Sequence, residues 1–204
     1  MSDTFNQSVS TVAQLNVAIL EADSLASGAT DTITFTGNIA LDGAQLTALN
    51  IASDVTLDIN GGGYTIDGGG TQRGLFVYAG SVDVSDLTIA DTKALGGAGG
   101  SGNSNSGGGG GGGAGLGGGL FIGSNVAGDA GDVTLTGVTF SGDAATGGNG
   151  TNGLFGGGGG LGGNAGSGDY SGGGGIGGNG GNTAADGQPG IVPKAAKGGG
   201  SGGI

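Results

Sequence analysis

The sequence predicts an all-β protein whose short strands wind into a solenoid, and three observations support this. First, short apolar, β-branched runs alternate with polar residues from Thr32 onward. Second, the breaks between these runs carry Gly, Asn or Asp, which are turn-forming residues. Third, one unit recurs: residues 119–122 resemble residues 74–77, and residues 133–140 resemble residues 82–89. A unit that returns along the chain is typical of a repeat architecture.

The recurring unit lies within residues 71–91, around which the rest of the chain is organised. Its two apolar runs, Leu75–Tyr78 and Val82–Ile89, are separated by Ala79-Gly80-Ser81, so we expect a break there. The alternation slips by one residue at Ser85-Asp86. This slip predicts two strand pieces with a bend between them.

Residues 1–9 are polar, and we expect them to form a flexible N-terminus. Segment 10–28 then carries apolar residues at helical spacing, beginning with Val12, Leu15 and Ile19. This spacing predicts a helix from about 12 to 23, with Thr11 or Ser10 as the N-cap. We expect the helix to cap an open end of the strand stack, because exposed strand edges promote aggregation.

The remaining chain divides by composition into four segments. We expect β-strand coils over residues 29–95, a glycine-rich insertion over 96–118, a further coil over 119–145 and a glycine-rich segment over 146–204. Insertions on one face of a repeat unit are common in solenoids and often form the binding side. The sequence ends without a capping segment, from which we expect a truncated chain.

Large residues in the last segment fall mostly at every third position. They are Asn149, Asn152, Phe155, Leu161, Asn164, Tyr170, Ile176, Asn179 and Asn182. A period of three is that of the polyproline II helix, which has no internal hydrogen bonds, so such segments would have to bond to one another. The sequence therefore allows a polyglycine-II-like arrangement, and a flexible low-complexity linker is the alternative.

Composition excludes several classes of function. The chain has 204 residues, of which 60 are glycine, and a net charge of −12, so it repels phosphate backbones and nucleic acid is not an expected partner. It has no cysteine and no histidine, which removes thiolate chemistry and the commonest general base. No apolar run is long enough to insert into a membrane, and the N-terminus lacks the basic and apolar parts of an ordinary signal peptide.

The helical segment, the residues VTLDINGGGYTIDGGG (55–70) and the recurring unit together resemble right-handed parallel β-helix proteins of pectin-lyase-like fold. The resemblance covers about residues 10–145 and is closest to the passenger regions of bacterial autotransporters and related secreted adhesins. It implies export to the cell surface or medium and a role in binding or adhesion. It specifies no catalytic residues.

Polysaccharide lyases and hydrolases share this fold, so a fragment of a carbohydrate-active enzyme is the first alternative. A hydrolase needs two carboxylates that face the sugar. Asp58 with Asp67, or Asp83 with Asp91, could form such a pair, and Arg73 is the basic residue among the strands that a lyase could use. Because Asp beside Asn or Gly commonly holds a turn, we expect a structural role for Asp58 and Asp67 and no enzymatic activity.

Three further sequence patterns could indicate a binding site for phosphate, for calcium or for ice. Gly61–Gly63 and Gly68–Gly70 are not phosphate loops, because no Lys-Ser/Thr follows them. Residues 166–170 and 180–182 match the calcium-binding nonapeptide repeat only loosely, so we expect no cofactor, with Ca²⁺ as the alternative. Threonine groups that could form an ice-binding face are Thr32, Thr34 and Thr36, and Thr134, Thr136 and Thr139. Threonine is also a common strand residue.

These observations predict a non-enzymatic structural or adhesive module of a secreted or cell-surface bacterial protein. We expect it to bind a surface glycan or protein, or a second copy of itself, through exposed loops and strand edges. We expect no catalytic, cofactor or metal residues.

Overall fold

The computed structural model describes residues 4–25, 28–101, 110–123, 130–151, 158–167, 173–176, 178–182 and 187–188. These residues are mostly strand or extended segments, with one helix. The chain forms two compact units: unit 1 contains Met1–Lys93 and Gly117–Ala144, and unit 2 contains Ala94–Leu116 and Ala145–Ile204. Their boundaries lie within two residues of the predicted segment boundaries near 95, 118 and 145.

The parallel strands of unit 1 form three rows. The first row contains β1 (Thr4–Val9), β2 (Thr30–Phe35), β5 (Thr56–Asn60), the C-terminal half of β7 (Leu75–Ser85), and β11 (Gly131–Thr136). The second row contains β3 (Ile39–Ala40), β6 (Thr65–Asp67), β8 (Thr88–Ala90) and β12 (Thr139–Ser141). The third row contains β4 (Leu49–Asn50), the N-terminal half of β7 and β10 (Leu120–Ile122). The short strands β9 (Lys93–Leu95) and β13 (Ala144–Thr146) pair separately.

The chain returns to the first row at nearly constant intervals. Thr4 pairs with Thr30, Thr30 with Thr56, and Thr56 with Ser81, which are steps of 26, 26 and 25 residues. The predicted recurrence is confirmed, because the matched residues are register partners. These partners are Leu75 with Leu120, Val82 with Val133, and Ile89 with Phe140.

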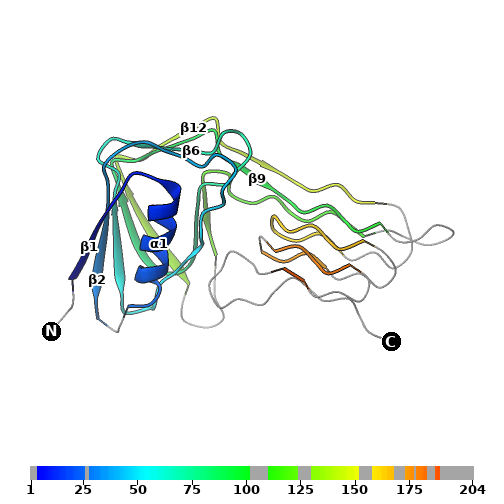
Figure 1. The fold of residues 1–204 in the computed structure, drawn as a ribbon, viewed down its shortest axis with the longest axis horizontal. Coiled ribbons are helices and arrows are strands. Elements are labelled where there is room, and N and C mark those ends of the chain that lie inside the picture. Colours follow the sequence, from blue (N-terminus) through cyan, green and yellow to red (C-terminus); the bar gives the residue numbers. More distant parts are fainter. Residues whose placement is uncertain are drawn as a thin grey trace. The chain divides into compact units, whose positions relative to one another are not determined.

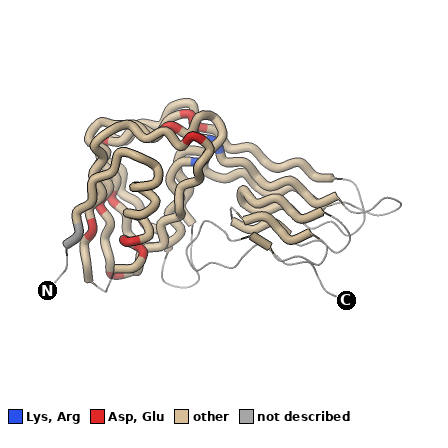
Figure 2. Tube along the Cα trace, in the orientation of Figure 1, with Lys and Arg blue, Asp and Glu red and all other residues tan. Residues whose placement is uncertain are grey.

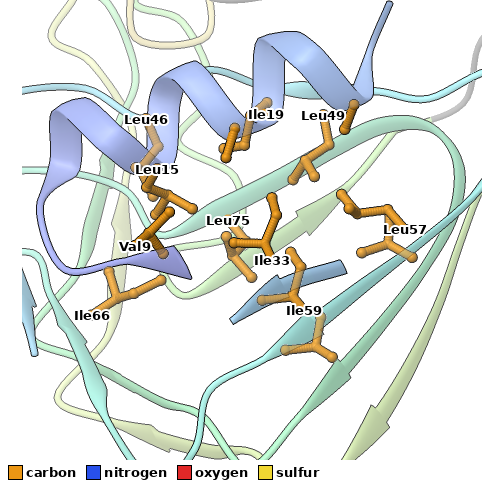
Figure 3. Packing of buried hydrophobic residues seen from close by; sticks show 14 of the residues in the cluster. Val9, Leu15, Ile19, Ile33, Leu46, Leu49, Leu57, Ile59, Ile66 and Leu75 are labelled. Carbon is orange, nitrogen blue, oxygen red and sulfur yellow. The ribbon is translucent and has the colours of Figure 1, made fainter. Parts of the chain in front are cut away.

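Alternation along each strand places apolar side chains in a common interior. Ile33, Ile59 and Val84 are register neighbours on successive strands, and each is at most 1% exposed. Figure 3 shows Ile33, Ile59 and Leu75 converging beneath the helix. Leu75 belongs to the same buried cluster, and Leu120 packs against it. The core of unit 1 is therefore a set of apolar columns that run from strand to strand.

The helix α1 (Val12–Ala22) closes this core beside β1 and β2 (Figure 1). Its buried residues Leu15, Ala18 and Ile19 belong to the same apolar cluster. The Thr11 hydroxyl accepts a hydrogen bond from the Gln14 backbone N–H at 3.3 Å. The predicted helix and its Thr11 cap are confirmed, with the last residue of the helix one position earlier than expected.

The Thr11 cap provides a first prediction. Thr11→Ala removes the acceptor for the Gln14 N–H and should lower the free energy of unfolding by about 1 kcal/mol. Thr11→Ser keeps a hydroxyl at the same position and should retain most of that stability. Urea unfolding followed by far-ultraviolet circular dichroism measures both variants. Equal losses in the two variants would contradict a role for the hydroxyl.

Two expectations for unit 1 are wrong. The N-terminus was expected to be flexible over residues 1–9, but Thr4–Val9 form β1, because their backbone groups pair with the whole of β2. A break was expected at Ala79-Gly80-Ser81, but β7 continues through these residues. The partners of β7 change at this point from β4 and β10 to β5 and β11, and Gly80 permits a local bend there with φ of +88°, a conformation that side-chain-bearing residues rarely adopt. The predicted bend at Ser85-Asp86 is confirmed, since β7 ends at Ser85 and Asp86 has φ of +49°.

The described residues of unit 2 form extended glycine-rich segments that bond to one another through the backbone. The Gly96 and Gly99 N–H groups donate to the carbonyls of Thr146 and Asn149, both in segment 145–151. Between them, the Gly97 N–H donates to the Gly160 carbonyl, and the Gly97 carbonyl accepts from the Gly113 N–H. Segment 96–100 therefore bonds to three neighbouring segments, and residues three apart bond to the same one.

The segments of unit 2 approach so closely that side chains are excluded at many contacts. A Cβ atom added to Gly97 would overlap the Gly163 carbonyl oxygen, and one added to Gly112 would overlap the Gly148 carbonyl oxygen. These segments run alongside one another in Figure 1. Of the residues predicted at period three, Asn152, Phe155 and Tyr170 lie outside the described residues.

Candidate functional site

The outward face of the first row carries three columns of small polar residues. The middle column contains Asn6, Thr32, Asp58, Asp83 and Thr134, in that order across the strands. The columns on either side contain mainly Thr and Ser: Thr30, Thr56, Ser81 and Asp132 on one side, and Ser8, Thr34, Asn60, Ser85 and Thr136 on the other. None of these residues is aromatic, so this face lacks a stacking platform for sugar rings.

Asp58 and Asp83 are direct register partners in the middle column. Asp58 lies half-buried at the centre of β5, and Asp83 is exposed on β7. Burial raises the pKa of Asp58, and the negative charge of Asp83 raises it further. The structure thus brings together two acids that the sequence reasoning had assigned to different pairs. Matching the apolar-Asp-apolar triplets at 57–59 and 82–84 could have revealed this pairing.

The two acid pairs considered from the sequence are not register partners. In the first pair, Asp58 lies in the first row, whereas Asp67 ends β6 in the second row. In the second pair, Asp83 lies in the first row, whereas Asp91 follows β8 of the second row. The Asp67 carboxylate accepts a hydrogen bond from the Gly69 N–H at 2.8 Å, which is the expected turn role. Asp58 is not at a turn. Two residues later, Asn60 accepts a hydrogen bond from the Gly62 N–H at 3.0 Å and so holds that turn.

Arg73 is buried in unit 1. Its side chain is 8% exposed, and its guanidinium lies 5.9 Å from the centre of the Phe76 ring. Burial lowers the pKa of Arg73. Among the described residues, its Nη1 atom has no hydrogen-bond partner. A side chain held in this way packs against aromatic surface and is poorly placed to take a proton from a polymer in solvent.

The comparisons with family models, curated proteins and solved structures gave no match. Among the described residues, no helix has the length and apolar character needed to span a bilayer, and no three His, Cys, Asp or Glu side chains converge as a metal site. Asp169, in the loose calcium-repeat match, lies outside the described residues.

The threonines considered for an ice-binding face do not form one continuous array. Thr32 and Thr34 lie on the outward face of β2, and Thr134 and Thr136 lie on the outward face of β11. The two intervening strands carry Asp58 and Asp83 in the same column. Thr36 follows β2, and Thr139 lies in the second row. The threonine patches are thus interrupted by charge.

Unit 2 contains an amide cluster that the sequence reasoning missed. The Oδ1 atoms of Asn164, Asn179 and Asn182 accept hydrogen bonds from the backbone N–H groups of Ala98, Asn164 and Ser167, at 2.9, 2.9 and 2.8 Å. The spacing from residue 164 to 179 is 15, as is that from 167 to 182. The signal was available, because GGGLGGN (158–164) recurs as GGGIGGN (173–179). These asparagines link segments, and they replace the backbone acceptors that a neighbouring strand would provide.

Charge is distributed unevenly between the described parts of the two units. Acidic residues lie along the strands and turns of unit 1, whereas the described residues of unit 2 carry no Asp, Glu, Lys or Arg (Figure 2). Neutral, closely packed backbone dominates the described part of unit 2. Any recognition of charged groups by the described residues therefore falls to unit 1.

Asp31 is an acid inside unit 1. Its side chain is fully buried and takes the inward position that Leu57 occupies on the next strand. Burial raises the pKa of Asp31, and the charge of Glu21 also raises it. The Thr32 N–H donates to its carboxylate at 2.8 Å, and the Gln7 amide donates at 3.4 Å. These two bonds oppose the increase in pKa and hold the carboxylate in place.

The raised pKa of Asp31 predicts the pH dependence of a variant. Well below pH 3.8 the acid is protonated in both states, so its ionisation does not affect folding. As the pH rises from 3.8 through the raised pKa, the unfolded chain ionises first and stability is lost. Asp31→Asn cannot ionise and still accepts the Thr32 N–H, so it should be more stable than the wild type at pH 7.

Urea unfolding at pH 3 and pH 7 measures this effect. The gain from Asp31→Asn should be present at pH 7 and absent at pH 3. Asp132→Asn, at an exposed position of β11, provides a control and should change stability by less than about 0.5 kcal/mol. The same gain at both pH values would contradict an ionisation effect.

Proposed function

We propose that the chain is a non-enzymatic structural or adhesive module of a secreted or cell-surface bacterial protein. In this proposal unit 1 is a right-handed parallel β-helix capped by α1, and unit 2 is a polyglycine-II-like lattice. The module binds through exposed faces and strand edges. The regular strand rows of unit 1 hold these surfaces in place.

The observation that carries the proposal is the order in which the chain visits the three rows. The chain passes through the first, second and third rows as β2, β3 and β4. It then repeats this order as β5, β6 and the first half of β7. The second half of β7, β8 and β10 repeat it once more. Parallel strands connected through such crossovers are right-handed in about 98% of cases, which supports the proposed hand.

The hydrogen bonding of unit 2 supports the second half of the proposal. A polyproline II helix has three residues per turn, so residues three apart point in the same direction. Gly96 and Gly99 donate to one neighbouring segment, while Gly97 donates to another. Two small residues per turn allow the close approach seen where an added Cβ would overlap a carbonyl oxygen.

The outward face of the first row also favours binding over catalysis. Apart from Asp58, Asp83 and Asp132, its columns carry hydroxyl and amide side chains on a regular strand spacing. Such a face offers many weak hydrogen bonds to an extended partner. The chain contains no histidine or cysteine, which removes the commonest general base and thiolate chemistry.

A bead-retention experiment tests the proposed function. Beads that carry the whole chain are passed over surfaces coated with glycans, with proteins or with the chain itself. The control beads carry an unrelated protein of similar size and net charge. We expect greater retention of the test beads on at least one surface. Equal retention of both bead types on every surface would overturn the adhesive role.

A carbohydrate-active enzyme is the second candidate, and the Asp58–Asp83 pair favours it. A carboxyl group such as Asp58, whose pKa is raised by burial and by a neighbouring negative charge, is typical of general acid–base sites. However, both carboxylates project from one sheet face as direct neighbours, whereas a hydrolase places them on opposite sides of the glycosidic bond. Release of reducing ends from polygalacturonate or related polymers, abolished by Asp58→Asn or Asp83→Asn, would establish this alternative. No release would exclude activity on these polymers.

A further inference from the structure

The N-terminal end of unit 1 presents a strand edge beside an apolar helix face. Among the described residues, β1 pairs only with β2, so its other edge has no strand partner. On α1, Val17 and Leu20 point away from the core and are 53% and 48% exposed. A groove of about 330 Å³ separates the two elements and is lined by Gln7 and Val9 of β1 and by Ala13, Val17 and Glu21 of α1.

The opposite end of the strand rows presents a second unpaired edge. Within the described residues, β11 and β10 pair only with β7, and β12 pairs only with β8. Each of these strands carries a partly exposed large apolar side chain: Leu135 on β11 at 41%, Phe140 on β12 at 44% and Ile122 on β10 at 44%. On inner strands the register partners Val84, Ile89 and Val77 are at most 1% exposed.

The two ends match in their order of elements. At one end, β1 belongs to the first row and is followed by α1. The next strands of the first row, β2 and β5, are followed instead by strands of the second row. At the other end, β11 belongs to the first row and is followed by β12 of the second row. If β11 of one copy lies parallel to β1 of another, Phe140 and Ile122 would come over the exposed face of α1. Leu135 would lie at the groove between β1 and α1.

We propose that unit 1 binds a second copy of this chain head to tail, with β11 of one copy adding to β1 of the next. This inference rests on the proposed function and names its partner. Strand addition would pair backbone groups on both edges, and apolar contact would cover Val17, Leu135 and Phe140. Because the two surfaces differ, each copy keeps one free end, so the contact does not close and assembly continues.

Electrostatics provides an independent readout of this contact. Each chain carries a net charge of −12, and acids lie at both ends, with Glu21 on α1 and Asp132 on β11. Repulsion between copies is screened when the Debye length falls from about 30 Å at 0.01 M salt to about 3 Å at 1 M. Association should therefore strengthen with salt.

Sedimentation velocity on the full chain tests the proposal with two variants, each of which has one of the two ends blocked. Val17→Glu blocks the helix end, and Leu135→Glu blocks the strand end. A charge introduced into an apolar contact should weaken association of either variant alone by about tenfold or more. An equimolar mixture should form heterodimers and stop there, because each variant retains the end that the other has lost. Tyr64→Glu, at a 36% exposed position between β5 and β6, adds the same charge as a control and should associate like the wild type.

The possible outcomes separate this inference from the proposed function. Wild-type mass that rises with concentration and salt, together with heterodimers in the mixture, supports head-to-tail binding. A wild type that stays monomeric at high concentration and 1 M salt overturns it, even if beads adhere to glycans or proteins. An unaltered assembly in either blocked variant, or no heterodimer in the mixture, also overturns it. Circular dichroism must show native spectra for both variants, and if one is unfolded, Leu20→Glu or Phe140→Glu replaces it at the same end.

Discussion

Replacement of Gly97 by alanine is expected to remove the order of the glycine segments of unit 2. The added Cβ would overlap the Gly163 carbonyl oxygen, which is backbone and cannot move to another rotamer. Gly97 also bonds to two different segments, donating to Gly160 and accepting from Gly113. Relief of the overlap must therefore separate at least one of these segments. Overpacking of this kind costs about 1–3 kcal/mol and sometimes more.

Hydrogen exchange followed by mass spectrometry measures this effect. In the wild type, amides of residues 96–100 and 158–165 should exchange slowly, and in Gly97→Ala they should exchange much faster. Gly111→Ala is the matched control, since an added Cβ there meets no atom within 4 Å and the backbone is not in the left-handed region. Equal exchange in both variants, or fast exchange in the wild type, would show that close backbone packing does not order unit 2.

The sequence predicted the glycine segments only in part. Their conformation could be predicted, because the period of three is a local property of each segment. A period of three in the large residues follows from the number of residues per turn, and it is visible along one segment. Which segments become neighbours is set by hydrogen bonds between residues as far apart as Gly97 and Gly160. Glycine at most positions provides no side-chain pattern to identify these partners. The 15-residue recurrence at Asn164 and Asn179 was the exception.

Unit 1 was more predictable, because apolar alternation and register are coupled. A shift of one residue would turn every inward side chain outward, so Leu75 and Leu120 could be paired from sequence alone. Polar residues on the outward face lack that constraint, which is why the Asp58–Asp83 pair was missed. β1 was missed for a related reason: its residues are polar, and the strand depends on pairing with β2.

Replacement of Ile59 by alanine is expected to lower the free energy of unfolding of unit 1 by about 2–5 kcal/mol, the usual cost of a large-to-small change in a core. Ile59 is 1% exposed and lies between its register partners Ile33 and Val84. Figure 3 shows Ile59 beside Ile33. A cavity at this position would remove contacts with both neighbouring strands. Since β5 pairs with both β2 and β7, the loss should also speed amide exchange in these two strands.

Leu135→Ala provides the matched control, because Leu135 continues the same column but is 41% exposed. Its removal should cost much less than removal of Ile59, since a smaller apolar area leaves contact with the core. Urea unfolding at a dilute concentration, where copies do not associate, compares the two variants. Similar losses would mean that the inner column is not closely packed, and the buried apolar cluster would then not account for the stability of unit 1. A large loss confined to Ile59 would instead place the stability in the stacked apolar columns and leave the outward polar face free for binding.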